Sequence, residues 1–229
     1  MIRVIKKFVL KDFLLEFKDI KSLVQLNQLH SGYLPWSGAS IRPTALVFLL
    51  NDIIINDRKT IAECGTGLST IYIASLFKQL EIKGNQIYSV DHDAAWIKIM
   101  ERELKKNKLD EYVHLIHAPL CRSDITYKNN LEWYDTSLLD RNIPENNIDL
   151  LFVDGPPAKE KGQEWSRYPA LPYFYDRLSH NFSVIVDDAD RKEEALIINK
   201  WQQKFPITFA QCILKGNIFI GGNYSSYTI

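Results

Sequence analysis

The stretch that most constrains this chain is residues 59–74, KTIAECGTGLSTIYIA. Its first apolar residues predict a short buried strand, and the apolar positions after Ser69 predict a helix. Between the two, a turn contains Gly65, Thr66 and Gly67. Glycines let a backbone approach a ligand closely, and the first turn of a helix offers unpaired N–H groups. The stretch therefore predicts a strand–turn–helix unit that binds a ligand.

Two side chains distinguish this turn from the turn of a dinucleotide site. Glu63 lies two residues before Gly65, where its carboxylate would repel a pyrophosphate. Thr70 stands where the dinucleotide fingerprint has its third glycine. A cofactor that carries a positively charged amino acid group suits the acidic residue better. The turn therefore favours an adenosyl cofactor of that kind.

The motif ECGTGLST, residues 63–70, resembles the first motif of class I S-adenosylmethionine-dependent methyltransferases. The resemblance extends over residues 46–220 and implies a Rossmann-like sheet, with the cofactor across the carboxyl ends of the first strands. Glu63 is then expected beside the amino group of the cofactor, through the loop or a water; the alternative is that it fixes the turn. The cofactor contacts implied by the motif are Glu63, Gly65, Thr66, Gly67, Ser69 and Thr70.

Strand and helix patterns alternate after the motif. Strands are expected over residues 60–63, 86–91, 112–117, 148–154 and 183–187, and helices over residues 69–80, 94–106, 170–179 and 192–204. Residues 123–147 form a polar insertion that is expected to include irregular structure, and two late strands near 207–214 and 217–221 form a hairpin. This alternation predicts a doubly wound α/β fold, with a mostly parallel sheet and an antiparallel edge hairpin.

Residues 1–43 are expected to form a helix and a loop before the methyltransferase domain, which is expected over residues 44–229. Apolar residues at helical spacing predict an amphipathic helix over residues 1–30. It would pack on the domain or form a homodimer; the alternative, a basic helix on a membrane surface, is disfavoured by its acidic residues. The loop over residues 31–43 either covers the pocket, with Trp36 as a stacking face, or is a packed connector.

The composition argues against several classes of protein. The chain has 28 basic and 28 acidic residues, so its net charge is zero, which argues against a large nucleic acid surface. No apolar run approaches the length of a membrane span, and the first residues lack a signal-peptide pattern. Three isolated cysteines indicate a reducing compartment. We therefore expect a cytoplasmic protein with one α/β domain.

Asp91 closes the second predicted strand, in YSVDHD. An acidic residue there can accept hydrogen bonds from both hydroxyls of a ribose, and the resemblance implies the same role. The alternative role, a cap on the next helix, suits Asp93 better. The turn after the third strand carries no acid, so the adenine is expected near His92 and against backbone groups around Ala118.

Acidic residues also end the fourth and fifth predicted strands. Asp154 stands in DGPP, and Asp187 and Asp188 follow the fifth strand. The carboxyl ends of parallel strands meet at one edge of a sheet, so these carboxylates would repel one another unless a cation or a proton intervenes. Mg²⁺ or a similar divalent ion takes three such oxygens readily. The resemblance also places Asp154 beside the methyl group of the cofactor.

The three acids are similar to those of metal-dependent catechol-type O-methyltransferases, in which a metal ion holds the hydroxyl of the acceptor beside the methyl donor. The lysine that this group has three residues after the fourth-strand acid is replaced here by Pro157. Three alternatives stay open. Asp154, Asp187 and Asp188 hold a metal ion; Asp154 or Asp187 is a metal-free general base; or the acids cap helices.

An acceptor pocket is expected from Trp36, Lys159, Trp165, Arg167 and Tyr168, because aromatic walls with polar tips suit sugars and aromatic rings. Together these features predict an S-adenosylmethionine-dependent methyltransferase that methylates an oxygen of a small or medium hydroxylated acceptor, a saccharide or a phenolic metabolite. A nitrogen acceptor, a nicotinamide-dependent oxidoreductase and a non-catalytic scaffold are the alternatives.

Overall fold

The computed structural model describes residues 2–30, 32–127 and 132–224, and for residues 2–9 and 11 it describes the helix without the side chains. The helices are α1 (Ile2–Leu26), α2 (Pro43–Ile55), α3 (Leu68–Gln79), α4 (Ala94–Asn107), α5 (Thr136–Asn142), α6 (Ala170–Phe174) and α7 (Lys192–Lys204). The strands of the main sheet are β1 (Thr60–Cys64), β2 (Gln86–Asp91), β3 (Val113–His117), β6 (Ile148–Val153), β7 (Leu178–Val186), β8 (Phe209–Cys212) and β9 (Ile218–Gly222). A separate hairpin consists of β4 (Leu120–Arg122) and β5 (Glu132–Tyr134).

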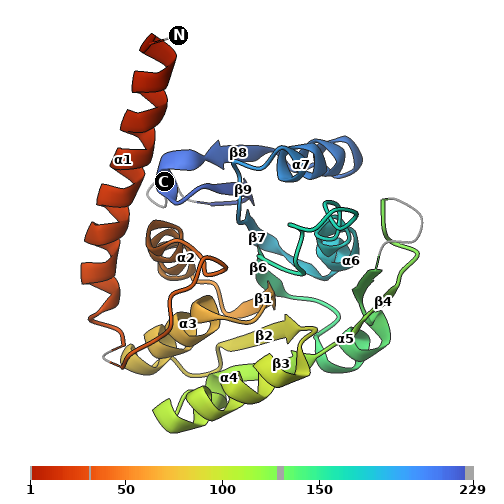
Figure 1. Cartoon of the computed structure of the whole chain (residues 1–229). Helices are drawn as coiled ribbons and strands as arrows, with labels where there is room; N and C mark the ends of the chain where they lie inside the picture. The colour runs from red at the N-terminus through yellow and green to blue at the C-terminus, as the bar shows by residue number, and fades with distance from the viewer. Residues whose placement is uncertain (1, 31, 128–131, 225–229) are drawn as a thin grey trace.

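The main sheet has seven strands in the order β3-β2-β1-β6-β7-β9-β8 (Figure 1). The first five of these are parallel, whereas β9 runs antiparallel to β7 and β8 runs antiparallel to β9. The predicted mostly parallel sheet with an antiparallel edge hairpin is thus confirmed. The strand order reverses between β1 and β6, and ligands of open α/β sheets bind in the crevice at that point.

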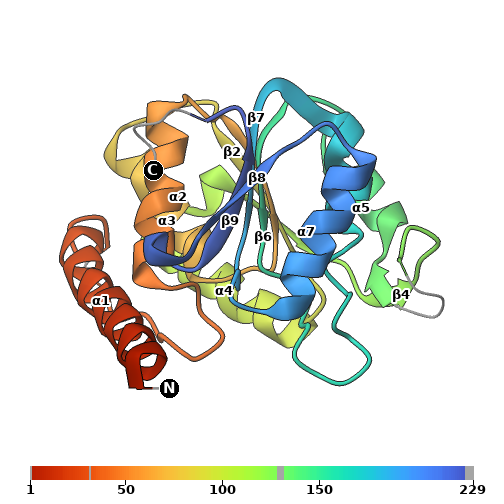
Figure 2. The ribbon, with the colours of Figure 1, turned by 90° about the horizontal axis from the view of Figure 1, so that it is seen from above.

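Helices cover both faces of the sheet, with α2 and α3 on one face and α5 and α7 on the other (Figure 2). Successive residues of a strand point to opposite faces, so one strand supplies two cores. Leu150 and Phe152 of β6 join the core under α2, α3 and α4, whereas Leu151 and Val153 join the core under α5, α6 and α7. Burial on both faces explains why β6 is apolar throughout.

The structure departs from the sequence prediction in two segments. Residues 123–147, which are expected to include irregular structure, also contain β5 and α5. The helix expected over residues 170–179 ends at Phe174 and continues as a 3₁₀ turn over Tyr175–Arg177. Strand β7 then begins early, because Leu178 already pairs with Ile148 of β6.

Helix α1 lies along the side of the domain and packs on α2 (Figure 1). Its inner face buries Leu15, Asp19 and Leu26, and Arg42 forms ion pairs with Asp19 at 2.5 Å and with Glu16 at 2.7 Å. These contacts attach the helix to the domain, which is one of the two arrangements expected for it. Among the described residues, no helix combines the length and the apolar content that crossing a membrane requires.

Candidate active site

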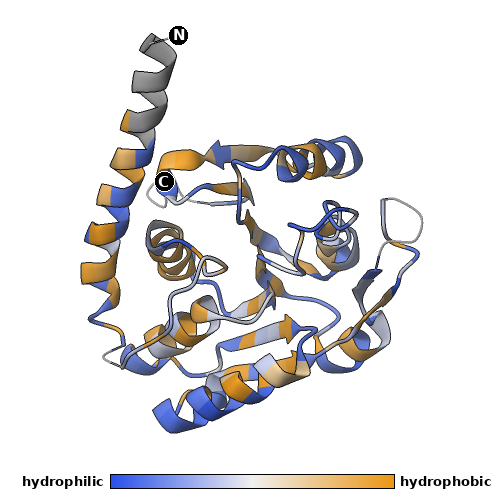
Figure 3. Ribbon diagram, in the orientation of Figure 1, coloured by the Kyte–Doolittle hydropathy of each residue, from blue (hydrophilic) through white to orange (hydrophobic). Residues whose placement is uncertain are grey.

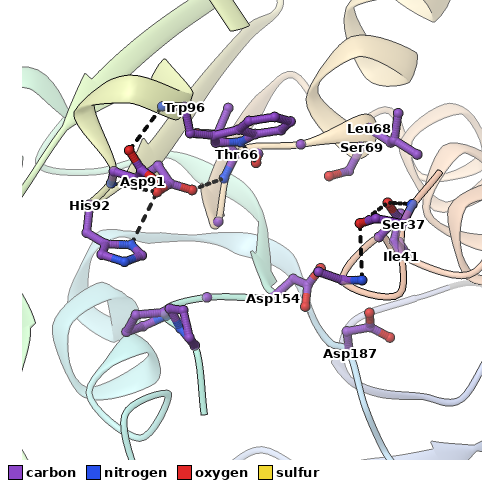
Figure 4. A pocket seen from close by; sticks show the side chains of 18 of the residues that line it. Ser37, Ile41, Thr66, Leu68, Ser69, Asp91, His92, Trp96, Asp154 and Asp187 are labelled. Carbon is purple, nitrogen blue, oxygen red and sulfur yellow. Dashed lines mark hydrogen bonds and ion pairs between the residues drawn. The ribbon is translucent and has the colours of Figure 1, made fainter. Parts of the chain in front are cut away.

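A cavity of about 600 Å³ lies at the carboxyl ends of β1, β2 and β6 (Figure 4). Its walls come from the glycine turn after β1, the end of β2, the start of α4, the segment after β6 and the loop before α2. The cavity therefore occupies the crevice where the strand order reverses, which is the position expected for a ligand site in this fold.

The glycine turn after β1 is held rigidly against the cavity. Gly65 has a φ of +96°, and a Cβ at this position would lie 3.1 Å from the backbone of Asp154, so only glycine fits. The N–H of Thr66 donates to Asp91 Oδ2 at 3.1 Å. On the other side, Trp96 Nε1 of α4 donates to the carbonyl of Thr66 at 2.7 Å. Strand β2 and helix α4 thus both fix the turn.

Glu63 lies beneath the glycine turn and not in the wall of the cavity. It is fully buried, and its Oε2 accepts hydrogen bonds from Thr70 at 2.5 Å and from Ser89 at 2.6 Å. The Thr70 hydroxyl also accepts from the N–H of Gly67 at 3.0 Å. Neither Glu63 nor Thr70 lines the cavity, and both side chains fix the turn, which is the alternative role of Glu63. A position of Glu63 beside the amino group of the cofactor, through the loop or a water, stays a prediction. Ser69 does line the cavity.

Glu63 makes folding stability depend on pH. Burial raises its pKa from 4.5 to about 7. Between these values the folded protein binds a proton that the unfolded chain has released, so the free energy of unfolding falls as pH rises through this range. The fall attributable to Glu63 is about 3 kcal/mol and is complete above about pH 7. We expect Glu63→Gln to match wild type at pH 5 and to be more stable at pH 8.

Urea denaturation at several pH values between 5 and 8 checks this prediction. The matched control is Glu101→Gln, on the exposed side of α4, which is expected to retain the wild-type dependence on pH. If Glu63→Gln also retained that dependence, the buried carboxyl would not be its source.

Asp91 faces the cavity at the end of β2. While its Oδ2 accepts from Thr66, its Oδ1 accepts from the N–H of Asp93 at 2.9 Å and lies 3.2 Å from His92 Nδ1. Each carboxylate oxygen has two lone pairs, so both can still accept a ligand hydroxyl. Asp93 caps α4 through the N–H groups of Ala95 and Trp96, as the sequence suggests. Asp91 is thus placed where a ribose-binding acid is expected.

The expected adenine contacts are only partly placed in the cavity. His92 lines it beside Asp91. Ala118 is fully buried and does not line it; its N–H donates to the carbonyl of Asp91 at 2.9 Å. The expected adenine contact of backbone groups around Ala118 therefore has no support from the lining of the cavity and stays a prediction. Ile99 and Met100 of α4 also line the cavity and supply apolar surface to its wall.

Tyr134, at the end of β5, is a cavity residue that sequence reasoning missed. Its side chain is fully buried, and its hydroxyl has no hydrogen-bond partner among the described residues. A Cβ on Gly155 would lie 2.6 Å from that hydroxyl, so a glycine is required there. A buried hydroxyl that lacks a partner and borders a cavity indicates a polar ligand atom. With Asp91 and the glycine turn, Tyr134 makes the cavity fit an adenosyl cofactor.

The three acids at the ends of β6 and β7 come together, as the sequence predicts. Oxygens of Asp154, Asp187 and Asp188 lie within 4.8 Å of one another, and Figure 4 shows Asp154 and Asp187 across the cavity from Asp91. Burial raises the pKa of Asp154 to about 6, although Arg167 opposes the shift. Burial, followed by the charges of Asp154 and Asp188, holds the pKa of Asp187 well above its usual range.

The arrangement of these acids does not fit a divalent ion. Three carboxylates are a suitable donor set for Mg²⁺. However, Nη2 of Arg167 donates to Asp154 Oδ1 at 3.0 Å, and its Nη1 lies 3.0 Å from Asp188 Oδ2. Arg191 also approaches Asp188, at 2.6 Å. Two guanidinium groups thus already pair with oxygens of Asp154 and Asp188 that a metal ion would need.

Only two of the five expected acceptor residues line the cavity, namely Lys159 and Arg167. Trp165 and Tyr168 belong to the core under α7, and Trp165 stacks on Tyr127 with ring centroids 4.5 Å apart. Trp36 does not line the cavity either. The rings of Trp36, Trp165 and Tyr168 pack against other aromatic side chains outside this cavity, so their acceptor roles stay predictions that the cavity does not support.

The loop before α2 covers the cavity, which is the first of the two alternatives for it. Residues 34–35 and 37–41 line the cavity, and Ser37 and Ile41 appear above Asp154 in Figure 4. Lys159 Nζ donates to the carbonyl of Gly38 at 3.3 Å, which joins the loop to the segment after β6. The loop can therefore shield a bound ligand from water.

A family model described as a methyltransferase domain matches residues 62–189, more than half of the chain. The matched segment contains the glycine turn, Asp91 and all three clustered acids. A comparison with curated proteins found no match.

Solved structures share the fold. An O-methyltransferase from Bacillus cereus, in complex with S-adenosylhomocysteine (SAH), is 17% identical with a TM-score of 0.59, and the match covers 90% of this chain and 91% of that chain. SAH-bound methyltransferase PaMTH1 from Podospora anserina is 15% identical with a TM-score of 0.58, over 90% and 88% of the two chains. A third match is the O-methyltransferase TomG from Streptomyces achromogenes, which is involved in tomaymycin synthesis and was solved in complex with S-adenosylmethionine (SAM). It is 14% identical with a TM-score of 0.55, and the match covers 89% of this chain and 90% of that chain.

Proposed function

The chain belongs to the family defined by this methyltransferase domain, and we propose that it is a SAM-dependent O-methyltransferase of a small or medium hydroxylated acceptor. The family match confirms the resemblance inferred from residues 63–70. The observation that carries the proposal is the placement of Asp91 and Asp154 in one cavity, because a ribose-binding acid and a proton-accepting acid must both reach the reacting molecules. Solved structures of the same fold that contain SAM or SAH support the cofactor.

The cofactor would be held from three sides. Asp91 would accept hydrogen bonds from the ribose hydroxyls, and the backbone around Gly65 and Gly67 would contact the amino acid part. Ile99 and Met100 would pack against the adenine. These roles leave the end of the cavity near Asp154 for the methyl group and the acceptor.

When bound, SAM supplies a methyl group that its sulfonium sulfur makes electrophilic. Arg167 holds Oδ1 of Asp154, which leaves the second carboxylate oxygen to take the proton that the acceptor hydroxyl loses as its oxygen accepts the methyl group. The loop before α2 excludes water, and the rigid strand ends orient both partners, so positioning supplies much of the catalysis. Asp187 is more deeply buried than Asp154 and is the second candidate base.

Calorimetric titration separates this function from its alternatives. We expect SAM and SAH to bind with micromolar affinity and NAD⁺ not to bind. A panel of saccharides, phenols and amines, assayed with methyl-labelled SAM, then identifies the acceptor and the methylated atom. Binding of NAD⁺ alone would favour the oxidoreductase, and failure of all three ligands to bind would favour the scaffold.

We further propose that a second copy of the chain pairs through the outer face of α1. Apolar side chains there recur every three or four residues, and hydrophobic segments recur along the helix in Figure 3. They are Leu10, Phe13, Leu14, Phe17, Ile20 and Val24, each at least 41% exposed. Together they offer on the order of 600 Å² per helix, so a symmetric pair buries about 1,200 Å², the lower limit of specific interfaces.

Replacing Phe17 and Ile20 with serine is expected to convert this dimer to a monomer, because both lie in the middle of the stripe. Sedimentation equilibrium at micromolar concentration measures the change. Leu196→Ser, which alters an exposed apolar residue of α7, is the control and is expected to remain dimeric. A monomeric wild type, or binding of the wild-type helix to lipid vesicles in place of self-association, would contradict the proposal.

The expected cytoplasmic location stays a proposal. It rests on the three free thiols, of which Cys64 is buried, Cys212 is half-buried and Cys121 is exposed.

A further inference from the structure

The guanidinium of Arg167 lies among the oxygens that a metal ion would use. It bridges Asp154 and Asp188, each at 3.0 Å, and lies 3.6 Å from Glu194 Oε1 on α7. It also donates to the backbone carbonyl of Asp154 at 3.1 Å. These contacts reach two of the three carboxylates of the acid cluster from inside it.

Because Arg167 is buried, its charge needs the carboxylates, and the carboxylates need its charge. Its side chain is 5% exposed, and arginine cannot release its proton in a protein. A buried charge must be paired, and removing one partner leaves the other uncompensated. The carboxylates therefore stabilise Arg167, while Arg167 offsets the repulsion among the carboxylates, which is the task that a metal ion would otherwise perform.

A divalent ion would have to compete with two positive side chains. Arg191 lies 2.6 Å from Asp188 and 3.4 Å from Glu194 on the outer side of the cluster. An ion bound to the same carboxylates would lie beside both guanidinium groups and would be repelled by them. The charges in the cluster thus oppose the entry of an ion even though the oxygens alone would attract it.

The backbone holds Arg167 in this position. Residues 163–170 form consecutive turns, with hydrogen bonds from Ser166 N to Gln163 O at 2.9 Å and from Ala170 N to Arg167 O at 3.2 Å. The Ser166 hydroxyl donates to the carbonyl of Pro157 at 2.9 Å, which ties these turns to the segment after β6. Arg167 is therefore presented by an anchored segment rather than by a long loop.

We propose that Arg167 takes the place of a metal ion in the acid cluster. Its guanidinium neutralises and orients the carboxylates of Asp154 and Asp188 without a divalent cation. The inference deepens the proposed function, since it assigns the counter-ion of Asp154. It does not depend on the identity of the acceptor.

Titration of the wild-type protein with Mn²⁺, followed by electron paramagnetic resonance, tests the proposal without cofactor or acceptor. We expect no site tighter than about millimolar in wild type, and binding at least about tenfold tighter in Arg167→Met, which vacates the cluster while keeping its volume filled. Arg177→Met, which removes an arginine paired with Asp140 outside the cavity, is the control and is expected to bind like wild type.

One Mn²⁺ per wild-type chain at micromolar affinity, lost in Asp188→Asn, would overturn the proposal. So would a folded Arg167→Met that gains no Mn²⁺ binding. If Arg167→Met does not fold, the titrations of the wild type and of Asp188→Asn still decide whether the acid cluster binds a divalent ion. Calorimetry with SAH on the same samples reports the cofactor site separately, so a failed methyltransferase function is not confused with a failed metal inference.

Discussion

Replacement of Asp91 with alanine is expected to weaken the binding of SAM and SAH by about 100-fold or more. Two charge-assisted hydrogen bonds to the ribose are lost, each contributing at least about 1.5 kcal/mol. The N–H groups of Thr66 and Asp93 also lose their acceptor, so the glycine turn is less well held. Calorimetric titration of the variant with SAH measures the loss directly.

The control for this variant is Asp135→Ala. Asp135 also caps a helix, because it accepts from the N–H of Ser137 at 3.0 Å, and it does not line the cavity. We expect this control to lose about 1 kcal/mol of stability and to keep wild-type affinity for SAH. An Asp91→Ala protein with wild-type affinity would show that the ribose lies elsewhere, and the orientation assigned to the cofactor would be wrong.

The sequence predicted the parts of the site that lie at strand ends. Asp91 ends one recognisable strand and Asp154 directly follows another, and the carboxyl ends of parallel strands meet at one edge whatever the details of packing. The gathering of Asp154 with Asp187 and Asp188 was predictable for the same reason. What these acids bind was not predictable, because Arg167 comes from turns between strands whose path the sequence pattern does not define.

Glu63 shows how strand alternation could have improved the prediction. Ala62 and Cys64 point to the core under α5, α6 and α7, so Glu63 between them points to the other face, where α3 begins. That parity places its carboxylate beneath the turn, next to Thr70 and Ser89. The family resemblance favoured a position beside the amino group of the cofactor, whereas the hydrogen bonds in the structure support the turn-fixing role that was the alternative.

Tyr134 could not have been predicted from local pattern. It reaches the cavity because β5 pairs with β4, in a register that sets Tyr134 opposite Leu120. Neither strand exceeds three residues, and the segment reads as polar and irregular. A contact between residues so far apart in sequence leaves no periodic signal in either segment.

Replacement of Asp154 with asparagine is expected to lower kcat by about 100-fold to 10,000-fold, which is the usual contribution of a general base. The amide keeps the size of the side chain, and its oxygen can still accept from Arg167, but it cannot take the proton of the acceptor. We therefore expect the affinity for SAH to change by less than about tenfold. The assay uses methyl-labelled SAM and the acceptor that the panel identifies.

Asp188→Asn distinguishes loss of the base from loss of the cluster. Asp188 pairs with Arg167 and Arg191, so its replacement disturbs the same charges and leaves Asp154 in place. A loss of kcat well below that of Asp154→Asn is expected, because the proton acceptor is retained. Equal losses in the two variants would mean that the charge balance of the cluster controls the rate, and a wild-type kcat in Asp154→Asn would assign the proton to Asp187. Only a selective loss in Asp154→Asn is compatible with the mechanism proposed here.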